Sequence, residues 1–175
     1  MTKKKDTSPV NEEHFTDGQD AEQGYAYDAD FNLEEEYIPA PVVASGIYHA
    51  SVTKVEFNPA DQTIDWIFVL NDNGGVMSDG STPIDGASFK YRNWLPKSGD
   101  ENEMSKDGRT TKRQAKIGFI ANFAESLGID MNTPKKIMEA ITYQEWIGLE
   151  ADLKLRVREY QGRMLNDIEK VIPAR

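Results

Sequence analysis

Strict alternation of side chains between residues 150 and 160 constrains the fold of this chain more than any other feature. In EADLKLRVREY, small or aliphatic residues occupy one parity and charged residues the other from Ala151 to Arg158. Successive side chains of a strand point to opposite faces of a sheet, so this pattern predicts a strand with one face in a core and the other in solvent. The inward set is Ala151, Leu153, Leu155 and Val157, and the outward set is Asp152, Lys154, Arg156 and Arg158.

Two β segments at the start of the folded region predict a hairpin. Residues 46–57, GIYHASVTKVEF, are rich in β-forming residues, and their apolar parity changes after Val52, which indicates a bulge. The turn sequence NPADQ then leads to residues 63–70, TIDWIFVL. Trp66 and Phe68 share the parity of the aliphatic residues in that segment, so we expect them in the core.

A third and a last strand complete the predicted sheet. FKYRNWL, residues 89–95, follows a long glycine-rich loop over residues 71–88. After residue 160, QGRMLN predicts a turn and NDIEKVIPA, residues 166–174, predicts a strand. Pro173 ends this strand and favours an edge position, because proline cannot donate a ladder hydrogen bond.

Two helices are predicted between the third and fourth strands. Thr111 and Gln114 have the spacing of a capping box, and Gly128 is a natural helix end. A second helix begins at Thr133 and Pro134 and continues to about Ile141. The apolar positions of the first helix recur at helical intervals and are Ile117, Ile120, Ala121, Ala124 and Leu127.

The order of three strands, a helical segment and two strands is the topology of the OB-fold. The sequence therefore predicts a mainly β protein with an OB-fold over residues 42–175. This fold is a five-stranded, partly open barrel, here with a helical insertion between strands 3 and 4. Another small barrel and an α+β sandwich are compatible with the same order.

The first 41 residues differ in composition from the rest and predict a disordered acidic N-terminal arm. Residues 1–40 contain three lysines against eleven carboxylates, a subtotal of −8, so only −2 of the net charge of −10 falls on the other 135 residues. The body is therefore nearly neutral, and its charges are free to segregate.

Composition and motifs indicate no enzyme. The chain has no cysteine, which excludes thiolate chemistry and is typical of a reducing compartment. Its two histidines, His14 and His49, lie in different regions and form no metal-binding pair. The sequence predicts no catalytic residues, no metal, no cofactor, no secretory signal and no membrane span.

Cations and exposed aromatic residues concentrate on the outward parity of two strands. Such a face suits single-stranded nucleic acid, because cations neutralise phosphates and flat rings stack on unpaired bases. Asp152 is the one carboxylate among the outward residues of these two stripes, positions 90–94 and 152–158. The candidate DNA-binding residues are Lys90, Arg92 and Trp94 in the third strand, Lys154, Arg156, Arg158 and Tyr160 in the fourth, and Lys112 and Arg113 at the start of the first helix.

Four segments of the chain resemble small phage-encoded single-stranded DNA-binding proteins of the OB-fold type. They are GIYHASVTKVEF, YRNWLP, AESLGID and VREYQGRMLNDIEKVIPA, and together they place the resemblance over residues 45–175. The resemblance implies a non-catalytic protein of the host cell cytoplasm that coats single strands during replication or recombination. Proteins of this class often end in an acidic tail that recruits partners, whereas this chain carries its acidic segment at the N-terminus.

Two other functions fit the same residues. In the first, the body is a structural or protein-interaction module of a virion or an assembly, and the acidic arm binds the partner. In the second, the acidic arm makes the protein a DNA mimic that occupies another protein's DNA site.

Overall fold

The computed structural model describes residues 30–175, and the chain divides into two compact units, residues 1–38 and 39–175. The described part of the first unit contains one helical turn, α1 (Leu33–Glu36). The Asn32 side chain caps this turn by accepting a hydrogen bond from the Glu34 N–H at 3.0 Å. The predicted arm, residues 1–41, thus holds a helical turn in its described part, and its residues 1–29 lie outside the described residues.

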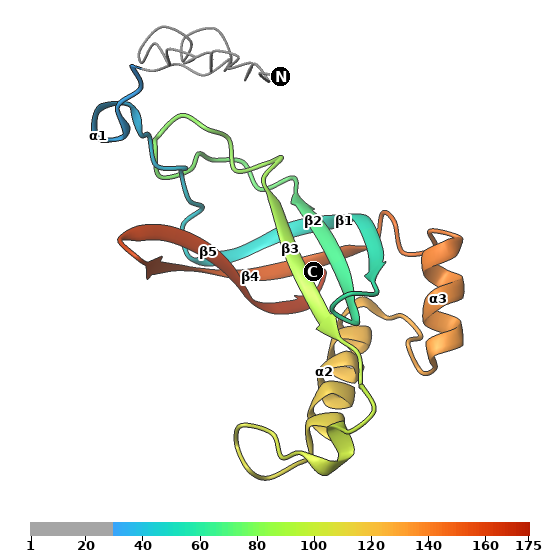
Figure 1. Ribbon diagram of the computed structural model, residues 1–175. Helices are drawn as coiled ribbons and strands as arrows, with labels where there is room; N and C mark the ends of the chain where they lie inside the picture. The colour runs from blue at the N-terminus through green and yellow to red at the C-terminus, as the bar shows by residue number, and fades with distance from the viewer. Residues whose placement is uncertain (1–29) are drawn as a thin grey trace, which may run out of the picture. The chain divides into compact units, whose positions relative to one another are not determined.

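One antiparallel sheet dominates the second unit. Its strands run in the order β3-β2-β1-β4-β5, so β3 and β5 are the two edges (Figure 1). No ladder joins these edges within residues 30–175, and the sheet is not closed. The predicted mainly β class, with a helical segment between the third and fourth strands, is confirmed. The strands are β1 (Gly46–Asn58), β2 (Thr63–Leu70), β3 (Ser88–Trp94), β4 (Glu150–Tyr160) and β5 (Arg163–Pro173).

Local sequence explains the hairpins of this sheet. The predicted bulge is confirmed, because the pairing of β1 with β2 shifts register between Val52 and Lys54. The predicted turn after β4 is too long: Gln161 and Gly162, with φ of 50° and 73°, close a two-residue turn, and β5 begins at Arg163. Two positive φ angles match the right-handed twist of paired strands, so the ladder continues almost to the turn.

Two capped helices fill the connection between β3 and β4, in agreement with the sequence. In α2 (Lys112–Leu127) the Thr111 side chain accepts the Gln114 N–H, and Gly128 ends the helix in the left-handed conformation. In α3 (Pro134–Thr142) the Thr133 side chain caps the first turn. None of the helices within residues 30–175 combines the length and apolar character needed to cross a membrane.

The core lies between the sheet and these helices. Trp66 and Phe68 are fully buried, as predicted. The Trp66 ring contacts Phe123 of α2 at a centroid distance of 4.7 Å and Trp146 at 5.1 Å. Figure 1 shows α2 and α3 at one end of the sheet and the β4–β5 turn at the other.

The buried face of α2 differs in part from the prediction. Ile120, Ala124 and Leu127 are buried as expected, and Phe123, absent from the predicted set, is buried with them. Ile117 and Ala121 are exposed instead. Phe123 stacks on Tyr91 of β3 at 4.9 Å, so the helix buries its Phe123 side against the sheet and leaves Ile117 and Ala121 exposed.

Candidate nucleic-acid interface

The outward row of β3 presents two cations and one ring, as the alternation predicts. Lys90, Arg92 and Trp94 share one side of the strand, and 47% of Trp94 is exposed to solvent. The Arg92 guanidinium lies over the Trp94 ring at 5.5 Å from its centroid, in cation-π geometry. The row therefore combines positive charge with an accessible aromatic surface.

A buried carboxylate on the neighbouring strand binds both cations. Pairing of β2 with β3 places Asp65 opposite Arg92. The Asp65 carboxylate accepts hydrogen bonds from Arg92 Nε at 2.8 Å and Arg92 Nη2 at 3.0 Å, and lies 2.7 Å from Lys90 Nζ. Burial alone would raise the pKa of Asp65, but the hydrogen bonds from Arg92, Lys90 and Thr63 outweigh burial and lower the pKa to about 2.

The row on β4 has counter-ions of the same kind on β5. Lys154 Nζ lies 3.0 Å from Glu169, and Arg156 Nη2 lies 3.7 Å from Asp167. Arg158 also pairs with Asp167. The adjacent strands β2 and β5 therefore add carboxylates, Asp65, Asp167 and Glu169, to the same side of the sheet as the cationic rows.

Asp152 itself is not the solvated residue that its parity predicts. It lies on the outward side of β4 but is buried, because His49 and Arg175 cover it. Val157, predicted to point inward, is only half-buried near the end of β4.

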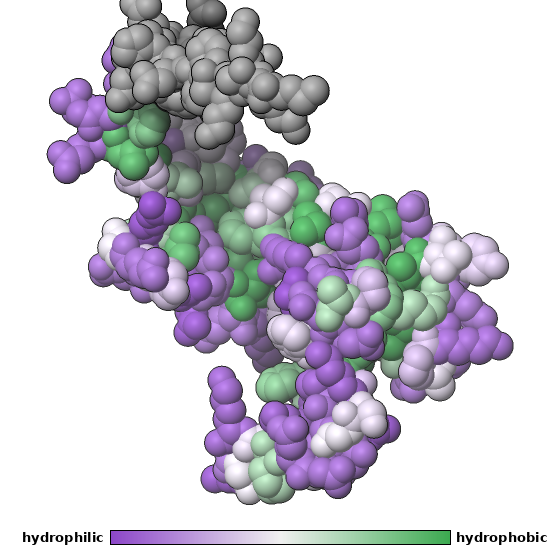
Figure 2. Space-filling view, viewed as in Figure 1, coloured by the Kyte–Doolittle hydropathy of each residue, from purple (hydrophilic) through white to green (hydrophobic). Residues whose placement is uncertain are grey.

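Three of the predicted residues meet in one groove between the sheet edges. Lys90 and Arg92 of β3 and Arg156 of β4 line it, together with Asn166 and Asp167 of β5. We call it the seam groove; its volume is about 480 Å³. Hydrophilic side chains, drawn purple in Figure 2, cover much of the surface over β3. The seam groove is a polar channel in which cations from two strands face one another.

The other predicted residues lie outside the seam groove. Tyr160, at the end of β4, is 54% exposed, and the Arg158 guanidinium lies over its ring at 5.4 Å. Lys112 pairs with Glu103 at the start of α2. Arg113 lines a different groove, beside α3. Of the predicted residues, Lys90, Arg92 and Arg156 line the seam groove, and the others, Trp94, Lys154, Arg158, Tyr160, Lys112 and Arg113, do not.

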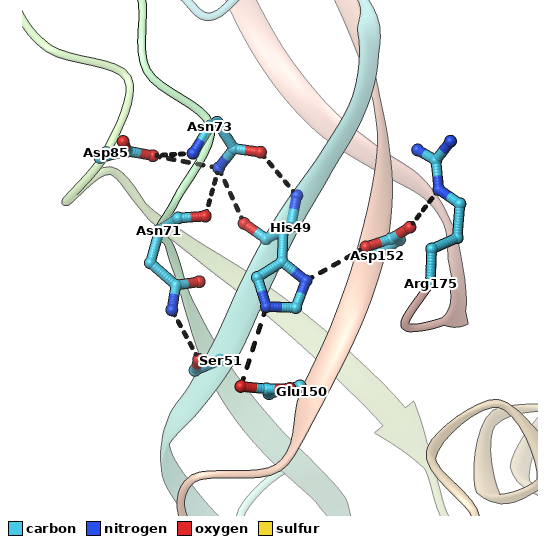
Figure 3. Close-up of polar contacts among 8 residues, drawn as sticks. All are labelled: His49, Ser51, Asn71, Asn73, Asp85, Glu150, Asp152 and Arg175. Carbon is cyan, nitrogen blue, oxygen red and sulfur yellow. Dashed lines mark hydrogen bonds and ion pairs between the residues drawn. The ribbon is translucent and has the colours of Figure 1, made fainter.

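A second polar cluster joins β1, β4 and the C-terminus (Figure 3). His49 Nδ1 lies 3.3 Å from Asp152 and His49 Nε2 lies 3.9 Å from Glu150. Arg175 Nε donates to Asp152 at 2.8 Å. Burial would raise the pKa of Asp152, but hydrogen bonds from Arg175 and His49 lower it. Both imidazole nitrogens face carboxylates, so the cluster cross-links the strands.

The Asn73 side chain anchors the loop after β2 to the same cluster. Its Oδ1 accepts the His49 N–H at 2.7 Å, and its Nδ2 donates to the His49 carbonyl at 2.9 Å. Asp85 in turn accepts the Asn73 N–H at 3.0 Å. Within residues 30–175, no cluster of histidine and carboxylate side chains could hold a metal ion.

A comparison with known protein families and with curated proteins finds no match to this chain.

Acid should weaken the folded state through Asp65. Its pKa is about 2 in the folded protein against an ordinary 3.8. A depressed pKa stabilises the fold above the ordinary pKa, and this contribution, about 2 kcal/mol, is lost as pH falls from about 4 to about 2. Urea unfolding should therefore show that the stability advantage of wild type over Asp65→Asn shrinks between about pH 5 and pH 2. A difference that stays constant with pH would contradict this role.

Proposed function

We propose that this protein binds single-stranded DNA without catalysis, through an OB-fold body over residues 42–175 of the kind found in phage-encoded single-stranded DNA-binding proteins. The strand order supports the fold, because β1 pairs with both β2 and β4 and a helical segment separates β3 from β4. OB-folds are partly open barrels that bind oligonucleotides on the face of strands 2 and 3.

The seam groove is the observation that carries the proposal. It brings Arg156 to Lys90 and Arg92, which belong to a strand far away in the sequence. A groove lined by cations can follow a phosphate backbone, and exposed rings beside it can stack on bases. Trp94 and Tyr160 are half-exposed rings, each next to an arginine of the cationic rows.

The ion pairs explain how a nearly neutral body would bind a polyanion. In the free protein Asp65 and Asp167 occupy the cations of the seam groove. Phosphates would replace these carboxylates as partners, so binding would be an exchange of anions with a strong dependence on salt. In this function the protein would coat single strands in the cytoplasm during replication or recombination, and its acidic arm would recruit other proteins.

Fluorescence anisotropy of a labelled oligo-dT, titrated at low and at high salt with duplex DNA as competitor, tests the proposal. We expect binding that salt weakens and that duplex DNA does not displace. Absence of binding by the full chain and by a chain lacking residues 1–40 would refute it.

Substitutions of Arg92 and Trp94 should have different signatures in that assay. Arg92→Ala removes a phosphate contact, so it should weaken binding to all sequences alike and reduce the salt slope by about 0.7. Trp94→Ala removes a stacking surface, so it should weaken binding by about 1–3 kcal/mol with little change in slope. Unchanged affinity in both variants would exclude the β3 face as the site.

Two matched variants control for general effects of charge and of aromatic surface. Lys135→Ala removes an exposed cation from α3, and Phe119→Ala removes an exposed ring from α2. Neither residue lines the seam groove. Both variants should bind oligo-dT as wild type does.

A protein-interaction module is the second candidate function, and the ion pairing of the cationic rows favours it. Each cation of these rows on β3 and β4 has a carboxylate within ion-pair distance, so the same rows could serve as the polar rim of a protein interface. Deletion of residues 1–40 distinguishes the two functions. It should strengthen DNA binding under the first and abolish partner binding under the second.

A further inference from the structure

An apolar groove lies between the two helices and the sheet, away from the seam groove. We call it the helix groove; its volume is about 510 Å³, within the range of about 300–1,000 Å³ that is usual for ligand sites. In Figure 2, hydrophobic surface drawn green is visible beside α3. Six apolar residues that line the helix groove are Phe57, Leu95, Ile117, Ala121, Ile137 and Met138.

One cation lines this groove without a carboxylate partner. Lys112 pairs with Glu103, and Lys116 Nζ lies 2.7 Å from Asp100. Among the residues that the structure describes, no carboxylate lies within ion-pair distance of Arg113. The helix groove therefore suits a segment that carries large apolar side chains together with carboxylates.

The described part of the acidic arm has this chemistry. Phe31, Leu33 and Ile38 are 60%, 70% and 86% exposed. The helical turn α1 between them contains three consecutive glutamates, residues 34–36. The Asn32 N–H donates to Glu36 at 3.0 Å and the Asn32 side chain accepts the Glu34 N–H, so two hydrogen bonds close the turn at its N-cap. The arm thus offers apolar side chains next to a compact negative charge.

Chain length assigns this segment to a second copy. Val43 is buried in the body, where its N–H donates to Asn166 at 2.8 Å. The connection through residues 39–42 spans at most about 18 Å. The helix groove includes Phe57, near the far end of β1, which is about 36 Å along that strand from Gly46. The connection is thus about half the length of β1, whereas a second copy is not limited by it.

We propose that residues 31–38 of one copy dock into the helix groove of another copy of this chain. Leu33 and Ile38 would fill the apolar groove, and the glutamates would face Arg113. Each copy has one segment and one groove, so two copies can exchange segments in a closed dimer, or the contact can repeat head-to-tail along a chain of copies. The proposal goes beyond DNA binding and does not depend on it.

Complementation between two full-length variants tests the docking. The arm variant, Leu33→Asp with Ile38→Asp, keeps an intact groove; the groove variant, Ala121→Glu, keeps an intact arm. By sedimentation velocity, wild type should associate increasingly with concentration, and each variant alone should have a dissociation constant at least about tenfold higher. An equimolar mixture of the variants should form a heterodimer, because one intact groove meets one intact arm.

Further variants make the test decisive. Ile117→Asp replaces a half-exposed lining residue and serves as a second groove variant if Ala121→Glu fails to fold. Phe119→Asp changes an exposed residue of α2 that does not line the groove, so it should associate as wild type does. Wild type that stays monomeric, or variants that mix without forming a complex, would overturn the proposal. These measurements contain no DNA, so their failure leaves the proposed function untouched.

Discussion

Replacement of Trp66 by alanine is expected to lower the free energy of unfolding by about 3–5 kcal/mol. The side chain is fully buried and contacts the rings of Phe123 and Trp146. Its indole N–H also donates to Asn93 at 2.7 Å, inside the core. The substitution therefore opens a cavity where β2 meets α2 and leaves the side-chain oxygen of Asn93, Oδ1, without its indole donor.

Urea denaturation measures this loss, and Trp94→Ala is the matched control. Trp94 is the same residue type on the neighbouring strand, but it lies on the exposed face. Its replacement should cost less than about 1 kcal/mol, because a half-exposed ring leaves no closed cavity. Equal costs for the two variants would mean that the assigned faces of β2 and β3 are incorrect, since a register slip of one residue exchanges them.

Asp65→Asn should increase the affinity for single-stranded DNA about tenfold, equivalent to about 1.4 kcal/mol. Asp65 holds Arg92 and Lys90 in the free protein, so phosphates must compete with its charge. Asparagine removes the charge and keeps the shape of the side chain. One more cation is then available to phosphate, and the salt slope should steepen by about 0.7.

The affinity change has to be separated from a general effect of net charge. Asp130→Asn is the control, because Asp130 also pairs with a lysine, but that lysine, Lys136, does not line the seam groove. Anisotropy titrations of both variants at several salt concentrations provide the comparison. Equal gains in the two variants would point to net charge alone, and a loss of affinity in Asp65→Asn would mean that Asp65 positions Arg92 for binding.

Local patterns predicted most of the secondary structure. The alternation in residues 150–160 and the parity change after Val52 both correspond to observed features, β4 and the bulge of β1. The caps at Thr111 and Thr133 were also predictable from the sequence, since a cap depends on residues within one helical turn. The first residue of β5 was harder to predict, because QGRMLN contains several turn-forming residues. Only the φ angles of Gln161 and Gly162 locate the turn.

The candidate site was predictable only in part. Parity alone placed Lys90, Arg92 and Trp94 on an outward face. It could not supply their counter-ion, because Asp65 is 27 residues away in the sequence. The sequence did contain a hint of this counter-ion. Asp65 is the one charged residue in the apolar segment TIDWIFVL, and a buried carboxylate requires a cationic or hydrogen-bonding partner.

Sequence periodicity thus specified which residues form strands and helices and which side of each strand meets the core, because these properties depend on neighbours a few positions apart. Pairing of distant strands specified the charge of the outer face, since β2 and β5 bring Asp65, Asp167 and Glu169 beside the cations of β3 and β4. The approach of the two sheet edges forms the seam groove, and the packing of α2 and α3 against the end of the sheet forms the helix groove. Such contacts join residues far apart in the chain, and no local pattern encodes them.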